Sequence, residues 1–480
     1  MHLAKKGALV FIIFPLILLT ISPANEEERK GEKLIAKKKV FFPIRGVVEG
    51  FYGPPWSEQE RLRLFDFFKE CNFNLYIYAP KDDALHRAKW REFYTKEQLR
   101  KFKELVERAS ENKISLCWAI SPGLSIRYSS KKDFQDLLKK CESINKVGVK
   151  WFALFLDDIP PRLIYEEDKE KFKDLSSAQV YLVNKLNKYL KKLDKDAHLI
   201  FCPTQYRGVK SSPYLETIGQ GLSKEILIFW TGPSVCSPQI TSDQAKAFGG
   251  AIKRKPLIWD NYPVNDFNRF RLFLGPIRNR SQTLYKDVSG LLSNPMNEGE
   301  ASKIALYTIA DYLRDPENYN PEKSWDEALR KVAGEDAYPY LKTLAENSQS
   351  SMLYLGESPL LLEKIGEFWK EYKKGKEYSG LKEEFAKFKE LKENLGKSLK
   401  NKELLKELSP YLDKLSLYGE AGELALLLLE KKRKKDKEDE LLKVKGDLEE
   451  VWKRCLANRY QVCGKALDLF IRKAKVEVFR

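Results

Sequence analysis

Eight short apolar runs alternate with longer amphipathic segments between residues 41 and 293, and this alternation constrains the fold more than any other feature of the sequence. Apolar runs of this length are typical of strands that are buried on both faces, as in parallel sheets. The segments between them have the three- and four-residue apolar spacing of helices. Eight strand–helix repeats predict an α/β fold of the (β/α)8 TIM barrel type. An open, doubly wound sheet gives a similar alternation but does not usually need eight strands.

The sequence also predicts where the repeated elements begin and end. Three of the helical segments open with a residue that is favoured as an N-cap, namely Ser57, Thr95 and Ser242. The expected strands are Phe41–Glu49, Asn74–Ala79, Ile114–Ile120, Trp151–Leu156, His198–Pro203, Ile226–Trp230, Pro256–Trp259 and Val288–Ser293. The expected helices include Ser57–Cys71, Thr95–Asn112, Lys131–Gly148, Ser176–Leu193 and Ser242–Lys253.

A helical pattern continues from the last apolar run to the end of the chain. Glu300–Arg314 is expected to be the closing helix of the barrel, and Ser324 through Glu327 has the form of a capping box that opens a helix at Trp325–Ala333. The remaining sequence is rich in Lys and Glu with apolar residues at helical spacing. We therefore expect a catalytic barrel over residues 40–315 and a C-terminal all-α helical bundle over residues 316–480.

The first residues have the pattern of a targeting segment. Lys5 and Lys6 precede an apolar run over residues 8–21, and Ser22-Pro23-Ala24 follows it. This order predicts a cleaved signal peptide over residues 1–24, and an uncleaved N-terminal anchor is the alternative. Residues 25–39 form a charged lead-in. We expect a secreted or extracytoplasmic protein with no stable membrane span after the signal is removed.

The formal net charge is +17, from 86 Lys and Arg against 69 Asp and Glu. The basic residues are interleaved with Glu along the helical segments instead of forming clusters with aromatic residues. This pattern favours solubility and ion pairing over nucleic-acid binding.

The cysteines and histidines argue against a metal site or a disulfide framework. The seven cysteines have no CxxC spacing, and the three histidines form no HExxH motif. Cys71, Cys117 and Cys202 fall in expected core segments and are interpreted as buried thiols. Cys455 and Cys463 would pair only if their helix bends, because two turns of helix separate them by about 12 Å. Neither a Walker motif nor a Rossmann glycine pattern is found, so we expect no cofactor and no metal.

The residues that follow the expected strands are polar or aromatic in nearly every case. In a (β/α)8 barrel these positions form the active site. Together they supply carboxylate, Lys, Tyr, Trp and Asn side chains, a mixture that suits a neutral, hydroxyl-rich ligand with an apolar face. A phosphate site would instead be expected to show Arg, Lys and glycine-rich helix starts. The segments are 49–53 (EGFYG), 79–83 (APKDD), 121–123 (SPG), 157–158 (DD), 203–206 (PTQY), 230–233 (WTGP), 259–261 (WDN) and 294–295 (NP).

Asp157 and Asp158 follow the fourth run directly. Taken alone, two acids at the end of a buried strand are more often the start of a loop than a catalytic pair. Pro160 and Pro161 prevent the strand from continuing. Since adjacent side chains of a strand point to opposite faces, both acids reach one site only if the backbone turns between them.

Two further acidic positions compete with this pair. Asp82 and Asp83 are assigned a structural role near the residues that follow them, and Glu49 is interpreted as a buried partner for Arg45 or Lys81. Both interpretations leave Asp157 and Asp158 as the candidate catalytic acids.

Residues 41–300 resemble the family 84 glycoside hydrolases, which include O-GlcNAcases and hyaluronidase-like bacterial β-N-acetylglucosaminidases. The matching segments occur in the family's order across the whole expected barrel, whereas no motif is found in the helical region. The segments are 46–53 (GVVEGFYG), 78–83 (YAPKDD) followed by 86–87 (HR) and 90–91 (WR), 152–159 (FALFLDDI), 201–204 (FCPT) with Tyr206, 230–233 (WTGP), 259–261 (WDN) with 265–266 (ND), and 294–295 (NP).

The resemblance implies retaining hydrolysis of terminal β-linked N-acetylglucosamine by substrate-assisted catalysis. In this mechanism the 2-acetamido oxygen of the substrate attacks the anomeric carbon and forms an oxazoline. Asp157 would accept the acetamido N–H, and Asp158 would be the acid that protonates the leaving oxygen and then the base that activates water. Two nearby carboxylates with different protonation states need pKa values that are pushed apart, and we expect like charge and burial to do this.

The resemblance also implies a set of residues that bind the sugar. Tyr206 would donate to the acetamido oxygen, and Asn261 would hold the same group beside Trp259, the wall of the acetyl pocket. The residues expected to hold the ring hydroxyl groups are Gly50, through its carbonyl group, Lys81, Asp266 and Asn294.

The leading hypothesis is therefore an exported exo-β-N-acetylglucosaminidase whose substrate is an N-acetylglucosamine-containing glycan or glycoprotein. The alternatives are an endo-acting, hyaluronidase-like glycosidase and a non-catalytic carbohydrate-binding surface protein. The sequence indicates neither the natural aglycone nor the oligomeric state, and nucleic acid is the least favoured partner.

Overall fold

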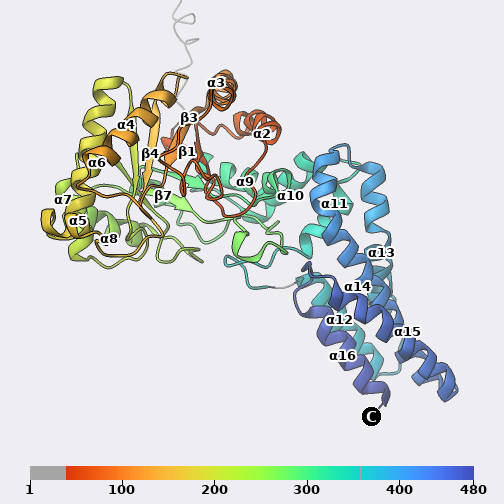
Figure 1. Ribbon diagram of the computed structural model, residues 1–480. Helices are drawn as coiled ribbons and strands as arrows, with labels where there is room; N and C mark the ends of the chain where they lie inside the picture. Colours follow the sequence, from red (N-terminus) through yellow and green to blue (C-terminus); the bar gives the residue numbers. More distant parts are fainter. Residues whose placement is uncertain (1–38, 357, 480) are drawn as a thin grey trace, which may run out of the picture. The chain divides into compact units, whose positions relative to one another are not determined.

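Eight parallel strands close into a barrel in chain order, each hydrogen-bonded to the next, and the eighth to the first. The computed structural model describes residues 39–356 and 358–479, so the predicted signal peptide and nearly all of the lead-in lie outside the described residues. The predicted (β/α)8 fold is confirmed (Figure 1). The strands are β1 (Ile44–Glu49), β2 (Leu75–Tyr78), β3 (Ser115–Ile120), β4 (Trp151–Phe155), β5 (His198–Cys202), β6 (Leu227–Trp230), β7 (Leu257–Asp260) and β8 (Gly290–Ser293).

Helices follow most of the strands and pack around the barrel (Figure 1). The two helices that the sequence pattern missed are short: one is almost entirely charged and has no apolar stripe, and the other has nine residues. Those two are α5 (Glu166–Lys171) and α7 (Pro213–Gly221). The others are α2 (Glu58–Glu70), α3 (Lys96–Glu111), α4 (Lys131–Asn145), α6 (Leu175–Leu193), α8 (Ser242–Ile252) and α9 (Gly299–Arg314).

Side-chain caps define the starts of several barrel helices. Ser57 and Thr95 cap α2 and α3 as predicted, each within a complete capping box. The prediction of Ser242 as the cap of α8 was wrong by one residue. Thr241 is the N-cap, because its hydroxyl accepts from the backbone of Gln244 while the Gln244 side chain accepts from the Thr241 backbone.

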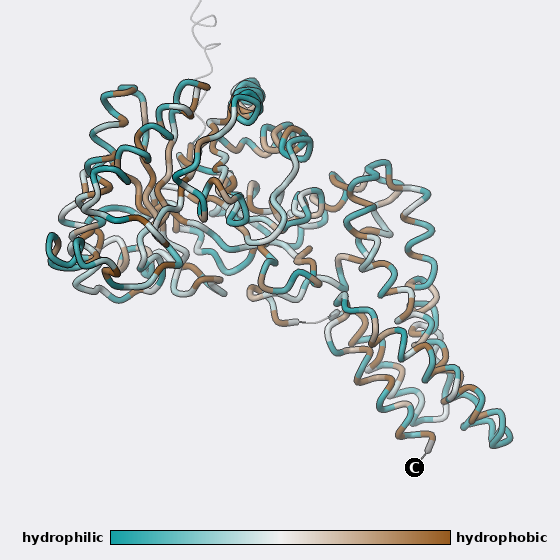
Figure 2. Tube along the Cα trace, viewed as in Figure 1, coloured by the Kyte–Doolittle hydropathy of each residue, from teal (hydrophilic) through white to brown (hydrophobic). Residues whose placement is uncertain are grey.

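The strands bury both of their faces, as the continuous apolar runs predicted. On β4, Ala153 and Phe155 point into the barrel interior, whereas Phe152 and Leu154 pack in the layer between the barrel and its helices. Figure 2 shows this hydrophobic centre in brown, with the hydrophilic residues farther out. The alternation matters for function because it decides which side chains reach the barrel axis beyond each strand end.

From α10 (Pro321–Ala333) onward the regular structure is helical. The predicted capping box at Ser324 was wrong: α10 begins at Pro321 with Asn320 as its N-cap, and Ser324 lies inside the helix. Proline at the first helical position is favoured because its missing N–H has no partner there in any case. The later helices are α11 (Tyr338–Glu346), α12 (Pro359–Lys373), α13 (Gly380–Ser398), α14 (Lys402–Lys434), α15 (Glu438–Ala457) and α16 (Ala466–Phe479).

The helix α14 is one of the elements through which the helical region contacts the barrel. The Glu407 carboxylate accepts hydrogen bonds from the backbone N–H groups of Glu300 and Ala301, at the start of α9. The Tyr411 hydroxyl donates to the carbonyl oxygen of Arg269 over 3.2 Å. That the barrel over residues 40–315 and the helical bundle over residues 316–480 are separate domains stays a prediction.

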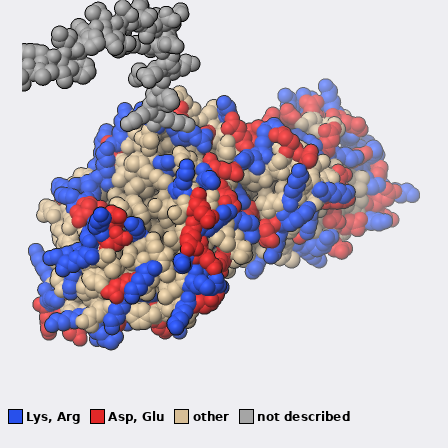
Figure 3. Space-filling model, turned by 90° about the horizontal axis from the view of Figure 1, so that it is seen from above, with Lys and Arg blue, Asp and Glu red and all other residues tan. Residues whose placement is uncertain are grey.

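The cysteines form no disulfide among the described residues, and the surface charges are of mixed sign. Cys71, Cys117 and Cys202 are buried free thiols as expected, and Cys455 and Cys463 are also buried and unpaired with each other. Acidic and basic side chains lie side by side on the face seen in Figure 3, which agrees with ion pairing as the main use of the charge. In the described part of the chain, we find no helix with the length and apolarity that a membrane crossing requires.

Candidate active site

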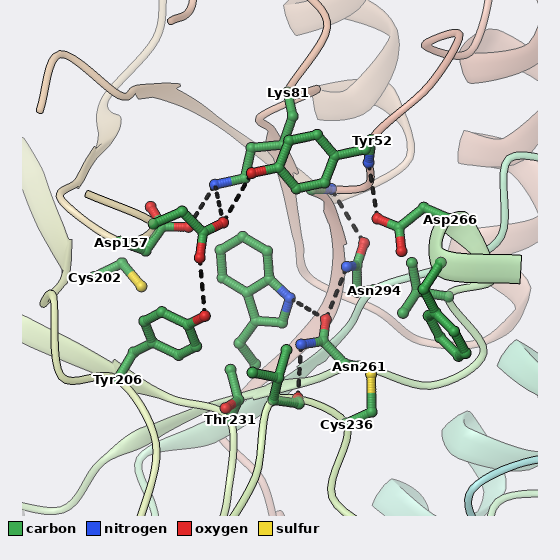
Figure 4. Close-up of a pocket in the computed structure, with 16 residues that line it drawn as sticks. Tyr52, Lys81, Asp157, Cys202, Tyr206, Thr231, Cys236, Asn261, Asp266 and Asn294 are labelled. Carbon is green, nitrogen blue, oxygen red and sulfur yellow. Dashed lines mark hydrogen bonds and ion pairs between the residues drawn. The ribbon is translucent and has the colours of Figure 1, made fainter. Parts of the chain in front are cut away.

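A pocket of about 470 Å³ opens at the carboxyl ends of the barrel strands, and all nine residues that were predicted to form the site line it (Figure 4). They lie at the carboxyl ends of β1, β2, β4, β5, β7 and β8 or in the segments that follow, so the fold gathers them from positions far apart in the sequence. The nine residues are Gly50, Lys81, Asp157, Asp158, Tyr206, Trp259, Asn261, Asp266 and Asn294.

Strand alternation explains why most of these residues face the pocket. The side chains of Phe155 and Trp259 point into the barrel interior. Asp157 lies two residues after the first of them, and Asn261 lies two residues after the second. A side chain that continues this two-residue period also points toward the barrel axis, just above the core. The lining residues placed in this way are Gly50, Lys81, Asp157, Thr231, Asn261 and Asn294.

Asp158 reaches the same pocket because the backbone turns at this residue. Its φ angle is +49°, in the left-handed region that non-glycine residues rarely adopt. In a continued strand its side chain would point away from Asp157, toward the surrounding helices. The turn that the adjacent acids and the following prolines predicted is therefore present.

Asp157 is buried and has two different oxygen environments. One oxygen, Oδ2, forms an ion pair with the Lys81 ammonium group. The other, Oδ1, has no hydrogen-bond partner among the described residues. Burial lowers the pKa of Lys81, but Asp157 and Asp158 outweigh burial and hold this pKa above its ordinary value. One oxygen of Asp157 is thus paired with an ammonium group, and the other is left as an acceptor in the pocket.

Asp158 is surrounded by hydrogen-bond donors. The hydroxyl groups of Tyr206 and Tyr52 donate to Oδ1 and Oδ2, each over 2.9 Å, and the Lys81 ammonium lies 3.9 Å from Oδ2. Burial raises the pKa of Asp158, but Lys81, the two hydroxyl groups and Arg87 outweigh it, so this pKa is lower than usual. The expectation that its protein surroundings favour a protonated Asp158 is therefore wrong, because Lys81 and the hydroxyl groups of Tyr52 and Tyr206 stabilise the ionised form.

An amide network fixes the opposite side of the pocket. Asn261 Oδ1 accepts from Trp259 Nε1 over 2.9 Å and from Asn294 Nδ2 over 2.8 Å, while Asn261 Nδ2 donates to the Val235 carbonyl oxygen. Asn294 Oδ1 accepts from the Gly50 backbone over 3.2 Å. These contacts set which end of each amide is the donor and leave each side-chain NH2 group with one further hydrogen to offer.

Close packing explains why residue 50 is a glycine. A Cβ atom at Gly50 would lie 2.2 Å from the Trp259 ring, which is far too close for a real contact. Nearby, Asp266 accepts from the Tyr52 backbone N–H over 2.9 Å, and burial raises the pKa of its carboxyl group. Gly50, Trp259 and Asp266 therefore belong to one packed wall.

The sequence interpretation missed several lining residues. Tyr52 is the most important of them, since it contacts Asp158 directly; it lies within the segment 49–53, but only the acid and the glycine there were considered. The segment that follows β6 contributes Thr231, which lies in the segment 230–233 but was given no role, and Val235 and Cys236, which no pattern distinguished from other loop residues. The missed residues are Tyr52, Cys202, Thr231, Val235, Cys236, Val264 and Phe267.

The competing acids lie outside the pocket. Glu49 is fully buried, but its partner is Arg61 of α2, not Arg45 or Lys81, because its side chain points outward from β1 toward the helix. Asp83 accepts from the Tyr78 hydroxyl over 2.8 Å and from the Leu85 backbone, which confirms the structural role given to it.

Neither of the two histidines in the described part of the chain, His86 and His198, lines the pocket. His86 is fully buried beside the Ala119 carbonyl oxygen, and burial lowers the pKa of its imidazole to about 3, so the ring is neutral. Among residues 39–356 and 358–479, no group of three or more His, Cys, Asp or Glu side chains is arranged to bind a metal ion. The carboxylates and tyrosines are thus the groups available for proton transfer.

Comparisons with known proteins agree with the resemblance seen in the sequence. Residues 45–346 match the β-N-acetylglucosaminidase family, and residues 360–471 match a family described as hyaluronidase post-catalytic domain-like. The protein O-GlcNAcases of Rattus norvegicus and Mus musculus are each 40% identical over 279 residues, which is 57% of this chain and 30% of each relative. The match thus spans less than a third of these relatives. A mutant O-GlcNAc hydrolase from Thermobaculum terrenum has a solved structure with 35% identity and a TM-score of 0.86, over 90% of this chain and 94% of that one.

Proposed function

Because this chain belongs to the β-N-acetylglucosaminidase family of glycoside hydrolases, we propose that it is a retaining exo-enzyme that removes terminal β-linked N-acetylglucosamine. The proposed mechanism is substrate-assisted, so that the acetamido group of the sugar, and no protein side chain, attacks the anomeric carbon. The usual scheme with two carboxylates requires one of them to be this nucleophile.

One observation carries the proposal: the buried Oδ1 atom of Asp157 lacks a hydrogen-bond partner among the described residues, in a side chain that lines the pocket. A buried acceptor without a partner is costly, and in native proteins it needs an explanation. The acetamido N–H of a bound sugar would satisfy it. The Asp157 carboxylate, which is paired with Lys81, would also stabilise the positive charge that develops on the acetamido group during ring closure.

Asp158 is proposed to protonate the departing glycosidic oxygen. Its lowered pKa in the free protein opposes this role, because an acid catalyst must be protonated. We propose that the Tyr206 hydroxyl changes its hydrogen-bond partner when the sugar binds, and that this change raises the pKa. The Tyr206 hydroxyl has one proton, which it donates to Asp158. If it turns to the acetamido oxygen when sugar binds, Asp158 loses one donor that stabilised its charge, and the bound sugar also excludes water. Both changes raise the pKa of Asp158 toward the value that an acid catalyst needs.

The second step reverses these roles. After the leaving group departs, Asp158 is ionised and accepts a proton from the water that opens the oxazoline. Water attacks from the face that the leaving group vacated, so the product keeps the β configuration. Asp157 continues to orient the acetamido nitrogen until the ring reopens.

The remaining residues are proposed to hold the sugar. Trp259 and the oriented Asn261 amide would enclose the acetyl group. The Gly50 carbonyl and Lys81 would contact ring hydroxyl groups, and Asp266 and Asn294 would bind the hydroxyl groups far from the cleaved bond. Lys81 is already paired with Asp157, so its contact with the sugar would be a second use of the same ammonium group.

Membership in a glycoside hydrolase family removes the reason to retain the non-catalytic alternative. The endo-acting alternative draws support from the hyaluronidase-like description of residues 360–471. We favour exo action because Asp266 and Asn294 join the same wall of the pocket as Gly50 and Trp259, where the non-reducing end of the sugar would lie. Cleavage of hyaluronan into internal fragments would contradict this choice.

The decisive test compares a nitrophenyl β-N-acetylglucosaminide with the matching β-glucoside, which lacks the acetamido group. We expect turnover of the first substrate only, and release of the sugar as the β anomer when the reaction is followed by proton NMR. Equal turnover of both substrates would rule out participation of the acetamido group.

Two features of the physiological setting are also proposals. The names of the relatives favour a glycoprotein as the source of the sugar, which a glycopeptide carrying a single β-linked N-acetylglucosamine would test. The basic and apolar residues at 5–24 favour export with removal of a signal peptide. The mass of the protein isolated from its native source would show whether that segment has been removed.

A further inference from the structure

Arg87 is absent from the residues that line the pocket, yet it contacts both Tyr52 and Asp158. It belongs to the loop between β2 and α3. Its Nη1 atom donates to the Tyr52 hydroxyl oxygen over 2.7 Å, and its Nη2 atom lies 3.4 Å from the backbone carbonyl oxygen of Asp158. The guanidinium carbon is 5.5 Å from the centre of the Tyr52 ring. None of the roles proposed above uses this residue.

The contact with Arg87 determines the direction of the Tyr52 hydroxyl. A guanidinium group only donates hydrogen bonds, so the hydroxyl oxygen must accept from it. The single hydroxyl proton of Tyr52 is then free to point to Asp158 Oδ2, 2.9 Å away. The result is a chain of donors that runs from Arg87 through Tyr52 to the proposed acid and base.

The loop that carries Arg87 is held firmly. The Asp83 carbonyl oxygen accepts from the backbone N–H groups of His86 and Arg87. The buried Lys140 ammonium, which extends from α4, donates to three carbonyl oxygens of the loop. These belong to Leu85 (2.6 Å), Trp90 (2.9 Å) and Glu92 (2.7 Å). The backbone on both sides of Arg87 is therefore fixed independently of the pocket.

We infer that Arg87 is a positioning residue for the proposed reaction: it holds the Tyr52 hydroxyl in the orientation that donates to Asp158. The inference rests on the proposed role of Asp158 as acid and base. It assigns Arg87 no contact with the sugar. Its effect passes through the Tyr52 hydroxyl, in addition to the direct attraction between the guanidinium charge and Asp158.

This role has a consequence for the dependence of the rate on pH. Lys81, the two tyrosines and Arg87 oppose burial and keep the pKa of Asp158 low, and loss of a donor raises this pKa. Since Asp158 must be protonated to act as the acid, kcat/KM falls as pH rises through its pKa. This fall is the alkaline limb of the pH profile, and a higher pKa of Asp158 moves the limb to higher pH. The charged or titratable groups that face Asp158 are Tyr52, Lys81, Arg87, Asp157, Cys202 and Tyr206.

The test is a double-mutant cycle on the full chain. We would measure kcat/KM against pH with phenyl β-N-acetylglucosaminide, a substrate whose poor leaving group needs the acid. Arg87→Met and Tyr52→Phe should each move the alkaline limb up, by about half a pH unit to one unit. The double variant should move it by less than the sum of the two single displacements, because the part of the Arg87 effect that passes through the hydroxyl is already lost in Tyr52→Phe.

A matched control separates this effect from a general loss of charge. Lys89 lies on the same loop and is exposed, with an ion pair to Glu92 at 3.5 Å. Lys89→Met removes the same charge from the loop and should leave the alkaline limb in place. Arg87→Lys keeps the positive charge but loses the planar guanidinium group with its several N–H donors. It should displace the alkaline limb less than Arg87→Met does.

Three results would overturn the inference. The first is an unchanged limb in Arg87→Met, the second is additive displacement in the double variant, and the third is a change confined to KM, which would make Arg87 a substrate-binding cation. If thermal unfolding shows that Arg87→Met does not fold, an unchanged limb in Tyr52→Phe would serve as the contradiction.

Failure of the proposed function would look different. Asp158→Asn should remove the alkaline limb; if the limb persists in that variant, the role of Asp158 is wrong. If Asp158→Asn removes the limb but Arg87→Met leaves it in place, the proposed function stands and only the role of Arg87 fails.

Discussion

Lys81 of the barrel and Lys414 of the helical region are both buried, and the two have opposite surroundings. Lys81 in the barrel pairs with Asp157 and lies 3.9 Å from Asp158. Lys414 of α14 instead donates to the backbone carbonyl oxygens of Cys455 and Asn458, at the carboxyl end of α15. The first lysine serves a group with chemistry to perform, whereas the second satisfies the orphan carbonyls of a helix end.

The buried carboxylates show the same contrast. Both oxygens of Glu407 accept backbone N–H groups at the start of α9, so its hydrogen bonding is satisfied by the fold. Asp157 has one oxygen without a partner among the described residues. Burial and charge alone therefore do not mark the functional region. Asp157 differs from the other buried side chains with an unsatisfied polar atom, such as Ser324 and Ser348, because it also lines the pocket.

The largest effect is expected from the two lysines. Lys81→Met leaves buried Asp157 without its counter-ion and should lower kcat/KM on the order of 10³-fold. Lys414→Met leaves two carbonyl oxygens unsatisfied and should lower the unfolding temperature while kcat/KM changes less than about twofold. Steady-state kinetics and thermal unfolding of both variants check the pair. Equal losses of activity in the two variants would remove the distinction between the regions.

The next largest effect is expected from replacing a glycine by alanine, compared at one position in the barrel and one in the helical region. Gly50→Ala places a Cβ atom against the Trp259 ring and should lower kcat/KM by about 10²-fold, since misplacement of a binding wall disturbs the reacting geometry. Gly446→Ala, in α15, meets nothing within 4 Å and should stabilise the protein by about 0.5–1 kcal/mol without a change in rate. Full activity in Gly50→Ala would show that the ring can move at no cost.

A smaller effect concerns the stability of the contact between the two regions. Burial raises the pKa of Glu407 to about 8, above the ordinary value of 4.5. The folded protein therefore binds this proton more tightly than the unfolded chain does, and the stability contributed by the group falls as pH rises from about 4.5 to 8. Glu407→Gln should remove part of this decline, which unfolding temperatures at pH 5 and pH 8 would measure. An equally steep decline in the variant would assign it to other groups.

The smallest effect is expected at exposed apolar side chains. Phe267 is 60% exposed at the edge of the pocket, and Leu456 is 68% exposed on α15. Phe267→Ala should raise KM for an aryl substrate by about two- to fivefold with little change in kcat, because it removes a binding surface away from the acids. Leu456→Ala should change neither constant. A large fall in kcat for Phe267→Ala would place that ring nearer the reacting atoms.

The strands and most of the site were predictable because both follow from the two-residue period. Once eight apolar runs are recognised, the residue two positions beyond the last inward-facing core residue faces the barrel axis. Lys81, Asp157, Asn261 and Asn294 all occupy such positions. The two-residue period does not show what each of these residues does in the reaction. Those roles came from the resemblance to a known family.

What could not be predicted depends on which elements pack together. Glu49 pairs with Arg61 because α2 covers β1, which the local pattern around either residue does not show. The low pKa of Asp158 arises from Lys81 and hydroxyl groups that converge from the ends of β1 and β5. Tyr52 was overlooked for the same reason, since its partner Asp158 is 106 residues away in the chain.

The unequal roles of Asp157 and Asp158 are the central claim, and one measurement tests it directly. Asp157→Ala and Asp158→Ala would be compared on aryl β-N-acetylglucosaminides whose leaving groups range from phenol to dinitrophenol. We predict that Asp157→Ala is slow with every leaving group. Asp158→Ala should approach the rate of the unmodified enzyme for the first step, release of dinitrophenol, because that leaving group needs little protonation. The same dependence on leaving-group acidity in both variants would contradict the account.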